Sequence, residues 1–271
     1  MLRRLAALGA LACALLAPPA AAQLLFAVTE GVTYQATPKE IREKFEPIAD
    51  VIGKTLRREV RVVLVPAYND ARAGLGKQEY DFAFVHPAHV ALAEIKANRY
   101  RTVAWTAGFT EYTVSLLAKS DAPYKSVTDL RGLTLVTPDP DSITAWMVRA
   151  MLRQEKFGEK DLRVRTTRYQ DAVPFYIDNA FADVGATAAN SVVKGWTGKG
   201  GKVIGKSQSL PIKYIIASTR MSPNDAERVR EALVALGQTD AGRKTLEATG
   251  YKGFLVPNPA VDTSAIAWLG L

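Results

Sequence analysis

Residues 133–152 constrain the fold of this chain more than any other stretch, because they read as a strand, a turn and a helix in succession. Leu133 to Thr137 form a short apolar, β-branched run, and neither a central strand nor a helix continues through Pro138-Asp139-Pro140. Ser142 is a good helix N-cap, and apolar residues recur after it at the spacing of one buried helix face. The apolar residues of that face are Ile143, Trp146, Met147, Ala150 and Met151.

The predicted helix start has the properties of an anion site. A helix that opens at the carboxyl edge of a strand points unpaired backbone N–H groups outward, with the positive end of its dipole behind them. Ser142 and Thr144, which falls off the apolar face, add two hydroxyl donors at this corner, so no cationic side chain is required. The segment indicates either an oxyanion site or an ordinary capped helix in an α/β domain.

Residues 1–22 have the pattern of a secretory signal peptide. Arg3 and Arg4 precede an apolar run too short to span a bilayer, and Ala20-Ala21-Ala22 forms a small-residue cleavage site. We therefore expect a periplasmic protein whose mature chain begins at Gln23. A lipoprotein anchored through Cys13 is the alternative, although this cysteine lies inside the apolar run. Cys13 is the only cysteine, so the mature chain would have neither disulfides nor cysteine-ligated metals.

Charge and hydropathy exclude two classes of partner. The net charge of +8 includes Arg3 and Arg4, and without them 33 Lys and Arg face 27 Asp and Glu, a net charge of +6. These charges are scattered, and no basic run with interleaved aromatic residues favours nucleic-acid binding. After the signal peptide, no apolar stretch is long enough to cross a membrane.

Strand and helix patterns alternate along the mature chain, which predicts an α/β fold. The strand patterns cover 24–29, 60–65, 81–85, 101–106, 112–119, 133–137, 163–167, 182–185, 202–205 and 212–218. The helix patterns cover 38–56, 69–76, 87–98, 142–152, 170–179, 188–196, 223–236, 242–248 and 264–269.

Two long strands, 112–119 and 212–218, enclose a middle block with its own strands and helices. If both strands cross between two lobes, the chain begins in lobe one, builds lobe two and returns to complete lobe one. The expected division is lobe one at 23–118 and 215–271 and lobe two at 119–214, with bending near Lys119 and Ser218. Helix N-termini from both lobes would then line a ligand cleft between them.

Several segments, in this order and spacing, resemble one known family. They are FEPIADVIGKTL, YDFAFVHPAHVALAE, EYTVSLLA with Tyr112, KSVTDLRGLTLVTPDPDSITAW, YQDAV with FADVGAT, and ALVALGQTDAGRKTLEATGYKGFLVP. The chain is similar over nearly its whole mature length to the phosphate, phosphite and phosphonate group of ABC-transporter substrate-binding proteins. The resemblance implies the type II periplasmic binding-protein fold: α/β, two lobes with mixed sheets flanked by helices, and a ligand cleft between the lobes.

The resemblance also implies a set of ligand-binding residues. The oxyanion cradle of the family matches Ser142, Ile143, Thr144 and Ala145, where members usually have Ser-Thr-Ser-Gly. A helix-opening tyrosine of the family matches His89, and a histidine before an acidic residue matches Gln170. Four departures leave the fold assignment in place but leave the exact oxyanion open.

Other candidate ligand residues have structural alternatives. Tyr34, Tyr68 and Tyr169 follow predicted strands, where a phenol reaches a ligand or packs on the surface. His86 and His89 are the only histidines and lie across a helix start, so they line a cleft edge or cap and pack the helix.

Carboxylates and metal ligands complete the candidates. The carboxylate of Asp141 would pair with a cationic part of a ligand or act in acid/base chemistry, and no two carboxylates are brought together by the sequence. With no third histidine and no cysteine in the mature chain, we expect no metal and no cofactor.

Two function classes remain. The first is a monomeric periplasmic binding protein that captures a small anion for the permease of an ABC importer, or for a sensor kinase, as some relatives do. Its ligand is a phosphonate, phosphite or phosphate-like oxyanion, or else a different small acidic or organic solute. The second class is a secreted enzyme, which the absence of a GxSxG elbow, a cysteine and a metal cluster disfavours.

Overall fold

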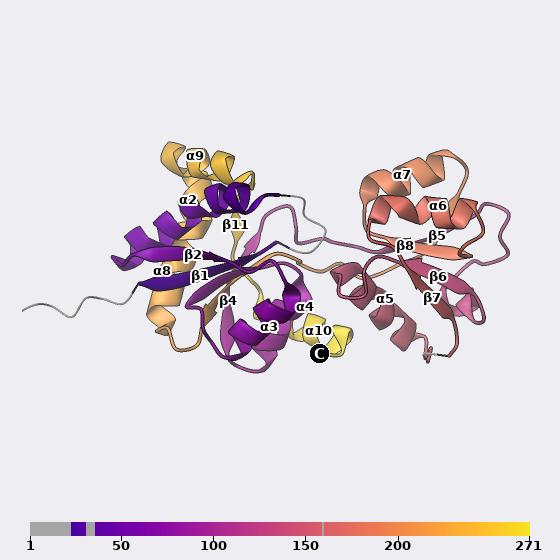
Figure 1. Ribbon diagram of the computed structural model, residues 1–271, viewed down its shortest axis with the longest axis horizontal. Coiled ribbons are helices and arrows are strands. Elements are labelled where there is room, and N and C mark those ends of the chain that lie inside the picture. The colour runs from indigo at the N-terminus through magenta and orange to yellow at the C-terminus, as the bar shows by residue number, and fades with distance from the viewer. Residues whose placement is uncertain (1–22, 31–35, 159) are drawn as a thin grey trace, which may run out of the picture.

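Two β-sheets form the centres of two lobes that lie side by side along the long axis of the molecule (Figure 1). The structure is a computed structural model, and it describes residues 23–30, 36–158 and 160–271. The predicted signal peptide at 1–22 and Tyr34 lie outside the described residues. Within them, no helix combines the length and apolar character needed to cross a bilayer.

The sheet of lobe one has six strands in the order β11-β4-β10-β3-β1-β2. β1 pairs in parallel with β2 and β3, whereas β10 runs antiparallel to both β3 and β4. Its strands are β1 (Leu24–Thr29), β2 (Val60–Leu64), β3 (Phe82–Val85), β4 (Tyr100–Thr106), β10 (Tyr214–Ser218) and β11 (Phe254–Leu255). Because β3 is buried on both faces, it reads as the continuous apolar run Phe-Ala-Phe-Val.

Helices cover both faces of this sheet (Figure 1). On one face lie α2 (Pro38–Leu56), α8 (Pro223–Val234), η3 (Ala235–Gln238) and α9 (Asp240–Thr249). On the other lie α3 (Tyr68–Gly76), α4 (Ala88–Lys96) and α10 (Pro259–Leu269). The starts of α2 and α8 follow their sequence signals, since Thr37 accepts from Glu40 N and Ser222 accepts from Asp225 N.

The sheet of lobe two has five strands in the order β7-β6-β8-β5-β9. They are β5 (Ser115–Ala118), β6 (Thr134–Thr137), β7 (Arg163–Thr166), β8 (Val184–Thr187) and β9 (Lys202–Lys206). The helices are η1 (Val127–Leu130), α5 (Ile143–Gln154), η2 (Gln170–Ala172), α6 (Val173–Asp178) and α7 (Asn190–Gly198). α5 packs on one face through residues such as Met147 and Met151, whereas Val173, Ile177 and Trp196 from α6 and α7 cover the other.

Because β6 and β8 pair in parallel, their carboxyl ends lie at the same edge of the lobe-two sheet. This edge carries the starts of α5 and α7.

Two segments, 107–114 and 207–213, connect the lobes and pair with each other as they cross. Tyr112 and Leu210 exchange backbone hydrogen bonds of 3.1 and 3.0 Å, and Ile212 N donates to Phe109 O at 2.9 Å. The expected division differs from this arrangement, because β5 at 115–118 belongs to the sheet of lobe two and Tyr214 to that of lobe one. Lys119 and Ser218, the expected bending points, lie beyond the far ends of the crossings, at the outer ends of β5 and β10.

Helix α10 adds a third connection between the lobes. Asp262 anchors it to lobe one, where its carboxylate accepts from Thr102 Oγ1 at 2.6 Å and from Tyr214 OH at 3.0 Å. Toward lobe two, Trp268 Nε1 donates to Gln154 Oε1 at 2.9 Å, and Trp268 O accepts from Arg153 at 2.7 Å. The lobes are thus already in contact along the side occupied by α4, α5 and α10.

Candidate ligand-binding site

The start of α5 has the strand-turn-helix geometry that its sequence predicts. β6 ends at Thr137, and Ser142 adopts the extended N-cap conformation with its Oγ accepting from Ala145 N at 3.2 Å. The hydroxyl proton of Ser142 remains available, because its oxygen is the acceptor in that bond. Among the described residues, no group accepts a hydrogen bond from the N–H of Ile143 or Thr144. The corner therefore offers backbone and hydroxyl donors together.

Thr144 is buried, with 1% of its surface exposed, so the expectation that it falls off the buried face is wrong. Its Oγ1 lies 2.7 Å from the hydroxyl of Tyr112, which comes from the first crossing segment. Apolar spacing identifies only the apolar residues of a buried helix face. It therefore omits a threonine such as Thr144, which is buried because its hydroxyl has a buried hydrogen-bond partner. Burial raises the pKa of the Tyr112 phenol, so this group stays neutral and keeps its proton.

Gln170, at the start of η2, fixes the direction of its own hydrogen bond to Tyr112. Its Oε1 accepts from Ala188 N at 2.5 Å and from Thr187 Oγ1 at 3.1 Å, which leaves its amide nitrogen to donate to Tyr112 OH at 3.1 Å. The contact between Tyr112 and Thr144 then uses one hydroxyl proton, and the pair retains a second one whichever oxygen is the donor. The network therefore presents one free hydroxyl proton beside the start of α5.

Lobe one meets this corner through His89 and Arg72. His89 is buried at 2% exposure, and its ring stacks on that of Trp146 with centroids 4.7 Å apart and planes 18° apart. Arg72 Nη2 lies 3.3 Å from His89 Nε2 and 3.3 Å from Asp141 Oδ1. A guanidinium thus stands beside the predicted oxyanion corner, where the sequence required no cation.

The two histidines occupy different surroundings. His86 is joined to Pro87 by a cis peptide bond, and its Nδ1 lies 3.0 Å from the carbonyl oxygen of Ile212 on the second crossing segment. Burial lowers the pKa of His86 to about 4, and burial together with Arg72 and Arg149 lowers the pKa of His89 to about 3. Both rings are therefore neutral near pH 7. The sequence indicated Pro87 as the first residue of this helix. In the structure, Pro87 is instead the N-cap of α4.

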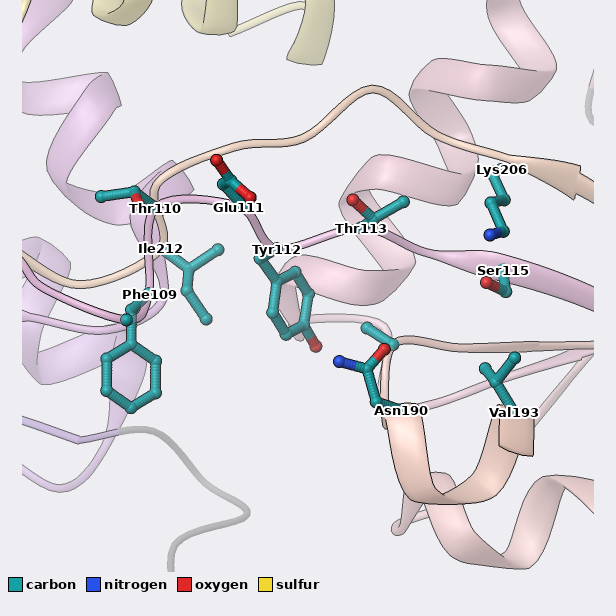
Figure 2. Close-up of a pocket in the computed structure, with 12 residues that line it drawn as sticks. Phe109, Thr110, Glu111, Tyr112, Thr113, Ser115, Asn190, Val193, Lys206 and Ile212 are labelled. Atoms are coloured by element: carbon teal, nitrogen blue, oxygen red, sulfur yellow. The ribbon is translucent and has the colours of Figure 1, made fainter. Parts of the chain in front are cut away.

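A cleft of about 670 Å³ opens between the lobes along the crossing segments. Figure 2 shows Tyr112 and Asn190 pointing toward each other in this cleft, with Phe109 and Ile212 toward lobe one and Ser115 and Lys206 toward lobe two. Tyr112 thus belongs both to the cleft and to the hydrogen-bond network at α5.

The remaining sequence candidates lie in varied positions. Tyr68 is the first residue of α3 rather than a loop residue, is buried at 6% exposure and has the Arg72 guanidinium 6.0 Å from its ring. Tyr169 precedes η2, half-buried, with Arg168 5.3 Å from its ring. In the described part of the chain, no three His, Cys, Asp or Glu side chains are grouped as metal ligands.

Sequence reasoning missed Arg72 and Asn190 and treated Tyr112 as a strand residue. Arg72 lies on a short helix one turn after Tyr68, and no local pattern connects it to His89 or Asp141. Tyr112 was part of a matched segment, and this was the available signal that it has a role beyond packing.

Two α/β lobes, joined by paired crossings and with helix starts and polar side chains between them, define a two-lobe periplasmic binding protein of type II. A family described as "ABC transporter, phosphonate, periplasmic substrate-binding protein" matches residues 31–261, and the chain belongs to this family. The family is one of binding proteins rather than enzymes. No match was found among curated proteins.

Solved structures agree with this fold. XAC2383 from Xanthomonas citri, bound to ATP, superimposes with a TM-score of 0.73 at 14% identity, covering 92% of this chain and 97% of that one. PhnD1 from Prochlorococcus marinus, in complex with methylphosphonate, gives a TM-score of 0.63 at 12% identity and covers 91% and 96%. A binding-protein component of a phosphonate ABC transporter from Pseudomonas aeruginosa gives 0.60 at 17% identity and covers 92% and 85%.

Proposed function

We propose that this protein captures a small oxyanion, a phosphonate, phosphite or phosphate, in the periplasm and delivers it to the permease of an ABC importer. The observation that carries the proposal is the donor set at the start of α5. It consists of two backbone N–H groups, the Ser142 hydroxyl and the free hydroxyl proton of the Tyr112–Thr144 pair. Such a set matches the oxygens of an ionised tetrahedral anion.

Two further observations support an organic phosphonate as the preferred ligand. The family is a phosphonate-binding family, and PhnD1, which shares the fold, is described in complex with methylphosphonate. The cleft of about 670 Å³ beside Tyr112 has room for a substituent on phosphorus. XAC2383 is described as bound to ATP, so nucleotides belong in the ligand panel.

Export is part of the same proposal. The pattern at 1–22 supports cleavage before Gln23 and release of the mature chain into the periplasm. Intact mass of the exported protein measures the cleavage point, and a lipid-modified N-terminus at Cys13 would contradict it.

A ligand panel tests the proposed chemistry. It contains methylphosphonate, aminoethylphosphonate, phosphite, phosphate, ATP, an alkanesulfonate and a dicarboxylate, each measured by thermal shift and calorimetry. A ligand at about 100 times its Kd stabilises the native state by about 2.7 kcal/mol, a shift of roughly 5 to 10 °C for a chain of this size.

A matched pair of variants identifies the site. Ser142→Ala with Thr144→Val removes one N-cap and one helix hydroxyl at α5, so we expect the oxyanion shift to disappear. Ser222→Ala with Thr197→Val removes the same two groups from α8 and α7, away from the corner, and should retain the shift. Each pair loses about 1 kcal/mol of stability from the cap. Oxyanion binding that survives in the first pair would refute the α5 site.

A further inference from the structure

A row of polar side chains crosses the sheet of lobe two at the end that faces the crossings. Thr187 on β8, Ser115 on β5 and Lys206 on β9 are direct cross-strand neighbours. Directly opposed residues of neighbouring strands project from the same face of a sheet. Thr187 is already occupied, because it donates to Gln170 Oε1 at 3.1 Å and accepts from Ala189 N at 3.1 Å. The row therefore continues the polar network of Gln170 outward, to Ser115 and Lys206.

Ser115 and Lys206 have side chains whose bonding capacity is unused. Both line the cleft of about 670 Å³, and neither side chain has a hydrogen-bond or ion-pair partner among the described residues. Ser115 is 5% exposed, and a buried hydroxyl in a native protein nearly always has a partner. Figure 2 shows the ammonium of Lys206 directed toward the Ser115 hydroxyl, on the lobe-two side of the cleft. A ligand in the cleft is therefore the partner within reach of both groups.

The start of α7 borders the same cleft. Asn190, the first residue of α7, lines it, and so does Val193 one turn later. The N-cap residue Ala189 provides no side-chain cap, and within the described ranges nothing accepts a hydrogen bond from the N–H of Asn190 or Ser191. Unpaired N–H groups and the positive end of a helix dipole favour an anion. An uncapped helix start, an ammonium and a buried hydroxyl thus meet at one wall of the cleft.

Glu111 carries the negative charge in the cleft lining. It belongs to the crossing 107–114, and Figure 2 shows Glu111 and Lys206 on opposite sides of Tyr112. The lobe-two wall of the cleft therefore has a positive charge without a carboxylate beside it in the described part of the chain. A cleft wall with charge of one sign attracts a ligand group of the other sign.

We propose that Lys206, Ser115 and the start of α7 bind a carboxylate of the ligand, so that the preferred ligand is a phosphonocarboxylate. This inference rests on the proposed function: the phosphonate group occupies the start of α5, and the carboxylate occupies the lobe-two wall of the cleft. Tyr112 lies between the two groups, because it lines the cleft while its hydroxyl contacts Thr144. Lysine suits this role, since it places a compact ammonium with three donors at the end of a flexible stem.

Pairs of acid and amide ligands measure the proposed subsite. Phosphonoacetate, phosphonopropionate and phosphonobutyrate differ in chain length, and the carboxamide of each has nearly the same shape without the carboxylate charge. Calorimetry at neutral pH gives the ratio of the amide Kd to the acid Kd for each length. We expect this ratio to reach about 10- to 100-fold at the best length, the range for hydrogen bonds to a charged group.

Variants of the cleft wall assign this preference to named residues. Lys206→Met removes the ammonium and keeps an apolar stem, so we expect the ratio to fall to about one, whereas Lys206→Arg should recover part of it. Ser115→Ala should reduce the ratio by about threefold to tenfold. Lys199→Met is the matched control, because Lys199 is an exposed lysine at the C-cap of the same helix and does not line the cleft. It should retain the wild-type ratio.

The outcomes separate the two proposals. If the wild type binds phosphonates but binds acids and amides equally, the inference is wrong and the proposed function stands. If Lys206→Met weakens acid and amide to the same extent, Lys206 acts on the phosphonate group and the carboxylate subsite is wrong. If aminoethylphosphonate binds more tightly than every acid, Glu111 selects the substituent and the inference is wrong. If the wild type binds neither these acids nor any oxyanion of the panel, the proposed function fails and this inference fails with it.

Discussion

Neutral donors dominate the candidate site at the scale of single residues. Tyr112 keeps its proton because burial raises its pKa, and His89 stays uncharged because burial and nearby guanidinium groups lower its pKa. Neutral groups whose protons are directed by fixed partners discriminate ligands by the number and direction of their lone pairs. In Gln170, this direction is imposed by the Thr187 hydroxyl and the backbone N–H of Ala188, which are more than 15 residues away in sequence. The sequence therefore indicates the donor types at α5 but not their directions.

The first prediction concerns the stability of the folded protein in weak acid. The pKa of His89 is about 3 in the folded protein and about 6.5 in the unfolded chain, so between these values the unfolded chain binds more protons. The stabilisation is complete above pH 6.5 and is lost as pH falls toward 3. His86, with a pKa of about 4, acts in the same direction. We expect each histidine to lower the free energy of unfolding by about 1 kcal/mol between pH 7 and 5.5.

Comparison of the wild type with His89→Asn isolates one of the two contributions. Chemical denaturation at both pH values gives the change in the free energy of unfolding between pH 7 and 5.5. We expect this change to be about 1 kcal/mol smaller in the variant than in the wild type. The charged groups facing His89 are Arg72 on α3 and Arg149 on α5, with His86 adding a weaker effect. An equal pH dependence in both proteins would mean that His89 is not neutral in the folded protein.

At the scale of helices and strands, local sequence patterns predict the elements themselves better than the contacts between them. The segment 133–152 folds as expected, with β6, a turn and α5 capped by Ser142, because proline chemistry and capping act within a few residues. Arg72, by contrast, reaches the site from α3 of the other lobe, and the partners of Gln170 come from the β8–α7 connection. The registers that bring these elements together depend on the packing of whole sheets, which no local spacing records.

The second prediction tests the packing that fixes the β8–α7 connection. Gly185 in β8 leaves no room for a Cβ, which would overlap Val173 and press on Ile177 and Val136. We expect Gly185→Ala to destabilise the fold by about 1 to 3 kcal/mol. It should also weaken methylphosphonate binding, since Thr187 and Ala188 hold Gln170 two and three residues later.

Gly195 on α7 is the control for this prediction. A Cβ at this position meets no atom within 4 Å, so Gly195→Ala should be neutral or stabilise the protein by up to about 1 kcal/mol through the gain in helix propensity. Denaturant titration of both variants measures the difference. Equal stability of the two would show that β8 and α6 separate easily.

Three connections restrict how the whole molecule can move. The crossings 107–114 and 207–213 are paired through Tyr112 and Leu210, so we expect any bending to involve both of them. α10 links Asp262 in lobe one to α5 through Trp268. The lobes therefore already meet on the side of α4, α5 and α10, and the cleft beside Tyr112 remains open. Motion on ligand binding should close the opposite side, where α9 of lobe one and α7 of lobe two lie (Figure 1).

The third prediction is that methylphosphonate brings α9 and α7 closer together. Because Cys13 is the only cysteine and precedes Gln23, a chain beginning at Gln23 accepts dyes only at introduced cysteines. Lys244 on α9 and Lys194 on α7 are exposed and suit this labelling. Energy transfer between Lys244→Cys and Lys194→Cys should rise on saturation with methylphosphonate, since hinge closure moves lobes as near-rigid bodies. The pair Lys244→Cys and Lys77→Cys, within lobe one, should not change. If transfer stays constant at saturating ligand in both pairs, the oxyanion binds without lobe closure, and the permease would have to recognise the loaded protein by a route other than its shape.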